Sequence, residues 1–303
     1  MYKKIIEDCI KDRKILPLDI ATGLAFDPCR GSVFVTIVFL SAAFRSGHLF
    51  VDISDVIEPS VSSIWGIDGE AIEAVIRDGF ALVSESNSIV KSGTRLYFER
   101  AYRDEQEILR HINRLQARNI EPSYVHKMEL LLLQARADNQ LTAAQAKALH
   151  ALVDKSIGMI AGGPGTGKTY TAGVFLKAFY GSFSNDDQKK IQIALAGPTG
   201  KAAQNLKKSI EIAFGAEYVF VEQQVEVKTL HSLLKLSRFS SFATVDSPLP
   251  YHLIIVDEAS MIDASLMKKL LSRIKVGTRL LFLGDPNQLP SVEPGAVFQE
   301  LVQ

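Results

Sequence analysis

A glycine-rich segment in the second half of the chain has the residue types and spacing of a phosphate-binding loop. It reads Gly-Gly-Pro-Gly-Thr-Gly-Lys-Thr over residues 162–169. Glycines allow successive backbone N–H groups to point inward around an anion, and a helix beginning near Lys168 adds the positive end of its dipole. We expect Lys168 to reach the β- and γ-phosphates of a nucleotide and the Thr169 hydroxyl to coordinate Mg2+. The predicted nucleotide-binding residues of the loop are Gly162, Gly163, Pro164, Gly165, Thr166, Gly167, Lys168 and Thr169.

Two other interpretations of this segment are a chance glycine-rich turn and a dinucleotide-binding fingerprint. The Gly-Lys-Thr ending argues against both, because neither requires a lysine followed by a hydroxyl residue. The apolar run at 157–161 leads into the loop, and residues 170–180 can form a helix after it. A strand, loop and helix in this order form the context in which a phosphate-binding loop works.

A second candidate is the pair of carboxylates Asp257 and Glu258, which directly follows the apolar run Leu-Ile-Ile-Val at 253–256. Ligands bind beyond the carboxyl ends of strands in open α/β sheets. We expect Asp257 to hold Mg2+, directly or through water, and Glu258 to orient and deprotonate a water molecule that attacks the γ-phosphate. Because acidic pairs often cap helices, this pattern gains its meaning from the phosphate-binding loop upstream.

A third polar cluster, Gly-Asp-Pro-Asn-Gln at 284–288, follows the last apolar run. Gln288 at this place could hydrogen-bond the γ-phosphate and report its presence. On local grounds alone, an ordinary Gly-Asp-Pro turn is the favoured interpretation.

The elements that must position these residues alternate along the chain from about residue 128. Apolar runs at 157–161, 191–196, 253–256 and 280–283 are bounded by turn residues and separated by helical stretches, and Thr142 is placed to cap an Ala-rich helix. Strands alternating with helices predict an α/β domain, with a parallel sheet covered on both faces.

The first 120 residues hold no recognisable site. Asp19 lies at or near the start of a predicted helix, and Leu96–Phe98 favours a short strand. The run at 33–44 fits a buried strand and a buried helix equally well. A helix is expected over 104–117, with Arg110, Arg114 and Arg118 on a solvated face, and 119–124 is the candidate linker. We therefore predict a smaller, mostly helical N-terminal domain at 1–120 and a nucleotide-binding domain at 121–303.

Composition restricts the class of protein and its cellular location. Lysine plus arginine and aspartate plus glutamate both number 34, which excludes a bulk polycation but not a local nucleic-acid track. Cys9 and Cys29 lack metal-ligand spacing, and the acidic start does not resemble a signal peptide. The most apolar run, 33–44, is well short of the roughly 20 residues that span a bilayer. These features favour a cytoplasmic protein that is not bound to a membrane.

The three polar segments, in this order and spacing, resemble the motifs of superfamily 1 helicases. The resemblance is strongest to the RecD branch, the alpha chains of the bacterial RecBCD helicase–nuclease (exonuclease V). The stretches 141–145, 196–203 and 229–234 resemble further motifs of the family, and 16–20 and 95–98 resemble parts of the RecD N-terminal domain. Tyr170 departs from the family pattern, in which a small hydroxyl residue usually follows the metal-binding threonine.

The resemblance implies a RecA-like P-loop domain that hydrolyses ATP with Mg2+ and moves 5′ to 3′ on DNA in double-strand break repair and recombination. It implies that Lys168, Asp257, Glu258 and Gln288 carry hydrolysis and that Gln145 contacts the adenine. It implies single-stranded DNA and RecB- and RecC-like subunits as partners. The DNA-facing residues that it implies are Pro198, Thr199, Lys201 and His231.

Helicases of this family use a second RecA-like domain that carries an arginine finger, and no such domain follows the third motif in this sequence. In GTPases, loss of the arginine costs about three to five orders of magnitude in rate. We therefore expect an N-terminal fragment of a motor, inactive in unwinding. Two alternatives stay open: a stand-alone helicase of the same branch, and an assembly module that binds nucleotide without productive turnover.

Overall fold

The computed structural model describes residues 15–54, 69–84, 88–117, 120–236, 247–288 and 297–302. The chain divides into two compact units, and the division lies after Glu107, inside helix α6 (Glu99–Gln116). This position is upstream of residue 120, where the sequence suggested the domain boundary, because α6 is one continuous helix that belongs to both units.

The first unit combines helices with a small antiparallel sheet. Its strands lie in the order β1-β3-β2, and the strand β3 contains the predicted run 96–98. Cys9 and Arg118 lie outside the described residues, and the predicted linker at 119–124 is described from residue 120. The elements of this unit before α6 are α2 (Pro17–Phe26), α3 (Ser32–Arg45), β1 (Phe50–Asp52), α5 (Gly69–Leu82), β2 (Ile89–Ser92) and β3 (Arg95–Phe98).

Helix α3 forms the centre of this unit and decides the open question over residues 33–44 in favour of a helix. Every side chain from Phe34 to Ala43 is buried, as expected of a helix that is apolar on all sides. A Cβ atom at Gly23 of α2 would lie 2.5 Å from Val38, and one at Gly79 of α5 would lie 2.0 Å from Thr36. Both neighbouring helices therefore approach α3 at a glycine, more closely than a side chain would allow.

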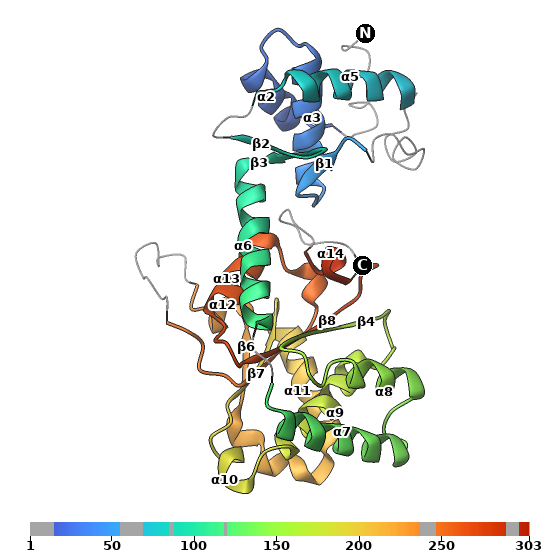
Figure 1. The fold of residues 1–303 in the computed structure, drawn as a ribbon, viewed down its shortest axis with the longest axis vertical. Helices are drawn as coiled ribbons and strands as arrows, with labels where there is room; N and C mark the ends of the chain where they lie inside the picture. The colour runs from blue at the N-terminus through green and yellow to red at the C-terminus, as the bar shows by residue number, and fades with distance from the viewer. Residues whose placement is uncertain are drawn as a thin grey trace. The chain divides into compact units, whose positions relative to one another are not determined.

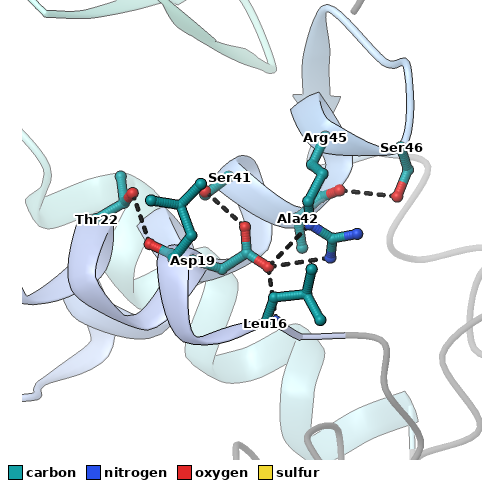
Figure 2. Close-up of polar contacts among 8 residues, drawn as sticks. Leu16, Asp19, Thr22, Ser41, Ala42, Arg45 and Ser46 are labelled. Carbon is teal, nitrogen blue, oxygen red and sulfur yellow. Dashed lines mark hydrogen bonds and ion pairs between the residues drawn. The ribbon is translucent and has the colours of Figure 1, made fainter. Parts of the chain in front are cut away.

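A fully buried carboxylate joins α2 to α3 (Figure 2). Asp19, in the first turn of α2, accepts hydrogen bonds from the backbone N–H of Leu16 at 2.9 Å and from Ser41 Oγ at 2.8 Å. Arg45 at the end of α3 donates to the same carboxylate, through Nη2 at 3.0 Å and Nε at 3.3 Å. The charge of Asp19 is thus balanced and its oxygens are satisfied, which is the condition under which a buried carboxylate is tolerated.

We expect Asp19→Asn to lower the free energy of unfolding of the first unit by about 2–3 kcal/mol. Removing one partner of a buried ion pair costs about 3–5 kcal/mol, and the partial exposure of Arg45 reduces this. Urea unfolding followed by circular dichroism measures the change. Asp78→Asn, at an exposed position on α5, is the matched control and should leave the midpoint unchanged. An equal shift in both variants would contradict the role of the Asp19 cluster.

The second unit is built on a five-stranded parallel sheet with the strand order β4-β8-β7-β5-β6. Its elements confirm the α/β prediction: β4 and β7 coincide with predicted runs, and β5 and β8 overlap them. The strands are β4 (Ile157–Ala161), β5 (Ile193–Gly197), β6 (Val225–Thr229), β7 (Leu253–Val256) and β8 (Arg279–Gly284).

Strand β6 was not predicted. Glu226 and Lys228 alternate with its apolar residues. Among the described strands it pairs with β5 alone, so it forms an edge of the sheet, where polar side chains are tolerated. The helical elements of this unit after α6 are α7 (Pro122–Ala137), α8 (Ala143–His150), α9 (Lys168–Gly181), α10 (Asn185–Gln188), α11 (Gly200–Phe214), α12 (Leu230–Leu233), α13 (Ala264–Arg273) and α14 (Val297–Val302), with short 3-10 turns at Gly215–Phe220, Glu222–Gln224 and Ala259–Met261.

Helices cover both faces of this sheet. One core contains side chains of α7, α8, α9 and α11 together with alternate residues of the central strands, such as Leu195, Ile255 and Leu283. Figure 1 shows α12 and α13 on the opposite side from α9 and α11. The predicted Thr142 cap is confirmed, since its side chain accepts a hydrogen bond from the N–H of Gln145.

One sequence interpretation in this unit was wrong. Arg114 was expected on a solvated face of α6, but its Nη2 atom donates to the carbonyl oxygens of Leu271 and Ile274, each at 2.9 Å. These carbonyls lie at the C-terminal end of α13, where partners within the helix run out, and one guanidinium binds both of them. Among the described residues, no helix is both long enough and apolar enough to cross a membrane.

Candidate nucleotide and nucleic-acid site

All the predicted site residues of the second unit lie at or just beyond the carboxyl edge of the sheet, except Gln145. Because the five strands are parallel, the segments that follow them emerge at one edge, and neighbouring strands lie about 4.8 Å apart. The segments after β4, β8 and β7 carry the predicted nucleotide residues. The segments after β5 and β6 carry the predicted DNA-facing residues.

The phosphate-binding loop joins β4 to α9 and depends on glycine at two positions. Gly165 and Gly167 have φ values of +74° and +77°, a region that side chains disfavour. A Cβ atom on Gly162 would lie 2.9 Å from Thr166 Oγ1, so the loop also packs closely on itself. The loop leads directly into α9, whose first N–H groups are free to meet an anion.

Lys168 lies inside this loop. Its Nζ atom donates to the carbonyl oxygens of Gly162 at 2.6 Å and Gly163 at 2.8 Å. Thr166 Oγ1 donates to the Gly163 carbonyl oxygen at 2.9 Å. The ammonium is therefore held by the loop in which phosphates are predicted to bind, and the same donor can exchange carbonyl oxygens for phosphate oxygens.

Gln145 approaches the loop from α8. Its Oε1 atom accepts from the Thr142 N–H at 2.9 Å, and its Nε2 atom donates to the Thr166 carbonyl at 3.3 Å. A Cβ atom on Gly167 would lie 3.0 Å from this Nε2 atom. Gln145 thus connects the start of α8 to the loop, and its predicted contact with adenine stays a prediction.

The two carboxylates differ in their surroundings. Asp257 is buried at the end of β7, and this burial raises the pKa of its carboxyl above the ordinary value, as does the charge of Glu258. The N–H of Glu258 at 2.9 Å, the charge of Lys168 and a hydrogen bond with the Thr169 side chain oppose the rise. Glu258 is half-buried and has a left-handed backbone with φ of 53°, which costs about 1–3 kcal/mol in a non-glycine residue.

Thr169 and Asp257 form a donor set that fits Mg2+. Their side chains interact across the gap between α9 and β7, and both offer oxygen, which Mg2+ prefers. Within the described residues, no group of three or more His, Cys, Asp and Glu side chains converges on one point. Sites that hold Mg2+ through one or two protein oxygens and the phosphates of a nucleotide need no such group.

The Gly-Asp-Pro turn begins at the last residue of strand β8, and β8 lies between β4 and β7. Asp285 is buried; its Oδ1 atom accepts from the N–H of Asn287 at 2.9 Å, and its carbonyl accepts from the N–H of Gln288 at 3.1 Å. These bonds fold the turn so that Gln288 follows a strand adjacent to both the phosphate-loop strand and the carboxylate strand.

Two residues of this turn were underrated by sequence reasoning. Asp285 was only part of a quoted motif, yet it organises the turn through its side chain. A Cβ atom on Gly284 would lie 2.7 Å from the ring of Phe298 on α14, so the glycine is required by packing. The N–H of Gly162 also donates to the Gly284 carbonyl at 3.2 Å, which ties the phosphate loop to this turn. The Gly-Asp pair after an apolar run was the only available signal.

The predicted DNA-facing residues follow two neighbouring strands. Gly197 of β5 pairs with Thr229 of β6, so the two strands end together. Lys201 is exposed in the first turn of α11, and His231 is exposed on α12. Pro198 is half-buried. Thr199 is exposed, but its hydroxyl already accepts the N–H of Ala202 at 3.2 Å as the cap of α11.

The arrangement of a phosphate-binding loop, a strand-end carboxylate pair and a parallel sheet covered on both faces defines a RecA-like P-loop nucleotide-binding domain. A family model described as an AAA domain matches residues 145–294, which contain all of these features.

Comparison with curated proteins narrows the class. The chain is 38% identical to RecBCD enzyme subunit RecD of Haemophilus influenzae over 69% of this chain and 34% of that protein. It is 30% identical to RecBCD enzyme subunit RecD of Mycolicibacterium smegmatis over 93% of this chain and 50% of that protein. The chain belongs to the RecD-like superfamily 1 helicases. A match of 32% identity to the ATP-dependent RecD2 DNA helicase of Deinococcus radiodurans covers 55% of this chain and 21% of that protein.

The chain spans half or less of the length of these curated relatives.

We expect Lys168→Ala to weaken binding of ATP and ADP about 10- to 100-fold, because hydrogen bonds to charged groups contribute about 1.5–3 kcal/mol. Isothermal titration calorimetry with Mg2+ present measures the affinity. Lys155→Ala, an exposed lysine before β4, is the control and should bind as the unaltered chain does. Equal affinity in the two variants would show that Lys168 does not contact the phosphates.

Proposed function

We propose that this chain is the N-terminal part of an ATP-dependent 5′-to-3′ DNA helicase subunit of a RecBCD-like complex, a cytoplasmic motor of double-strand break repair and recombination. The observation that supports the proposal is the common carboxyl edge of the sheet, where the predicted nucleotide-binding residues follow three strands and the residues predicted to face DNA follow the next two. Relatives named RecD support the RecB- and RecC-like partners, and the sequence likeness of residues 16–20 and 95–98 supports partner docking by the first unit.

In this proposal the chain supplies one wall of the motor cleft. The phosphate loop holds the nucleotide, and Lys168 neutralises charge on the β- and γ-phosphates. Thr169 and Asp257 would hold Mg2+, which supplies charge neutralisation on the phosphates when bound. Glu258 takes the proton of the attacking water, because its carboxylate is less buried than that of Asp257 and lies beside it. Gln288, in the turn after β8, hydrogen-bonds the γ-phosphate and so distinguishes ATP from ADP.

The raised pKa of Asp257 bears on this division of roles. Burial disfavours the charged form of the Asp257 carboxyl. A cation next to this carboxylate therefore stabilises it more strongly than it would stabilise an exposed aspartate. The hydroxyl of Thr169 and the ammonium of Lys168 already act in that direction. This environment suits a metal ligand better than a proton acceptor that must exchange with water.

We expect Glu258→Gln to retain Mg2+–ATP binding and to abolish residual hydrolysis, since the amide keeps the side-chain shape but cannot accept a proton. Asp257→Asn should instead reduce, about tenfold or more, the gain in ATP affinity that Mg2+ produces. Calorimetry with and without Mg2+, together with single-turnover hydrolysis, separates the two effects. Equal loss of nucleotide binding in both variants would contradict the separate roles.

Coupling between ATP and DNA is expected to need a second motor domain. We expect the 303 residues alone to bind single-stranded DNA weakly, with a shallow salt dependence, because one wall neutralises few phosphates. DNA should stimulate the ATPase little, and unwinding should be absent. A strand-displacement assay on a duplex with a 5′ single-stranded tail tests this. ATP-dependent unwinding by this chain would show that a second domain is dispensable.

A second candidate function is a stand-alone helicase of the same branch, outside a RecBCD-like assembly. The identity to the RecD2 helicase named above favours it. Co-purification with RecB- and RecC-like subunits from the source cell distinguishes the two: stable capture supports the complex, and a motor active without them supports the stand-alone enzyme.

A further inference from the structure

The turn that ends helix α12 has a backbone conformation that its residue disfavours. Lys235 has a φ of 52°, in the left-handed region. Its N–H donates to the Ser232 carbonyl at 3.1 Å, and the N–H of Leu236 donates to the His231 carbonyl at 2.9 Å. This pair of bonds is the Schellman motif, in which the left-handed position is usually glycine and sometimes asparagine.

A lysine therefore occupies a position that glycine or asparagine usually fills. Asn139 also has a left-handed backbone, which asparagine adopts more readily than most residues. Glu258 has one too, and it lies in the candidate nucleotide site. Unfavourable backbone conformations that persist point to function when the surrounding structure holds them. Here Arg273 of α13 holds the turn, since its Nη1 atom donates to the Leu234 carbonyl at 2.8 Å and its Nε and Nη2 atoms donate to the Ser247 carbonyl.

The side chain at this turn is free to bind a ligand. Lys235 is exposed, and within the described part of the chain its ammonium makes no ion pair or hydrogen bond. The turn follows β6 at the carboxyl edge and lies against the backbone of His231. Lys201 follows the neighbouring strand β5, so exposed cations follow both strands at this edge.

We propose that Lys235 contacts a backbone phosphate of single-stranded DNA and extends the path marked by Lys201 and His231. The inference rests on the proposed function, which supplies the nucleic acid. Arg273 anchors the backbone of this turn, so less loop ordering is required on binding. A phosphate contact adds affinity without sequence preference and raises the dependence of binding on salt.

The test is Lys235→Gly, which removes the charge and relieves the backbone. We expect the midpoint of thermal unfolding to stay equal or rise, while affinity for single-stranded DNA falls about fivefold at 0.1 M salt. The slope of log K against log salt should shrink by about 0.7, the value for one phosphate of a single strand. Fluorescence anisotropy with a labelled oligothymidylate, across a salt series, measures both quantities. Lys235→Asn should behave like the glycine variant, and Lys235→Arg should retain the affinity.

Arg30 provides a matched control, because it is also an exposed cation with a left-handed backbone, at φ of 58°, in the first unit. Arg30→Gly should leave the DNA affinity unchanged. Equal losses in the Arg30 and Lys235 variants would reveal a general effect of net charge and overturn the inference. If the unaltered chain binds DNA and Lys235→Gly binds it equally well, the inference about Lys235 is overturned, and the proposed function is not affected. If the unaltered chain bound no single-stranded DNA even at low salt, the proposed DNA-facing edge of the sheet would be overturned together with the inference.

Discussion

Parallel hydrogen bonding between five strands is the constraint on which the candidate site depends. Strand β8 pairs with β4 on one side and β7 on the other, so the phosphate loop, the carboxylate pair and the Gln288 turn begin at adjacent points. The bond from Gly162 N–H to the Gly284 carbonyl continues this pairing into the loop itself. Residues more than 100 positions apart in the sequence are thereby brought together.

The same edge carries the residues predicted for two kinds of binding, nucleotide and DNA. β7 also pairs with β5, so the strand that carries Asp257 and Glu258 lies next to the strand that leads to Lys201. The predicted nucleotide segments and the predicted DNA-facing segments therefore follow neighbouring strands. In a motor with two domains, this proximity would allow ATP and DNA to bias the same movement.

Polar groups at the ends of helices are satisfied by arginines in several places. Arg114 binds the last carbonyls of α13, and Arg273 binds the carbonyl after α12. In the first unit Arg45 instead balances the buried carboxylate of Asp19. The end of α13 is held by Arg114, so a charge that was expected on a solvated face is part of the packing.

The sequence alone determined the phosphate loop, the carboxylate pair and four of the five strands, because each depends on local spacing or on a short apolar run. It could not distinguish strand from helix over 33–44, since a fully buried element lacks periodicity, and the choice came from glycine-mediated contacts with α2 and α5. Strand β6, the turn-forming role of Asp285 and the contacts of Arg114 were also decided only by the tertiary structure. The bonds of Asp285 are local, but they form only once the turn after β8 is folded. Strand β6 and the contacts of Arg114 depend on partners distant in the chain, and such partners leave no pattern in the neighbouring residues.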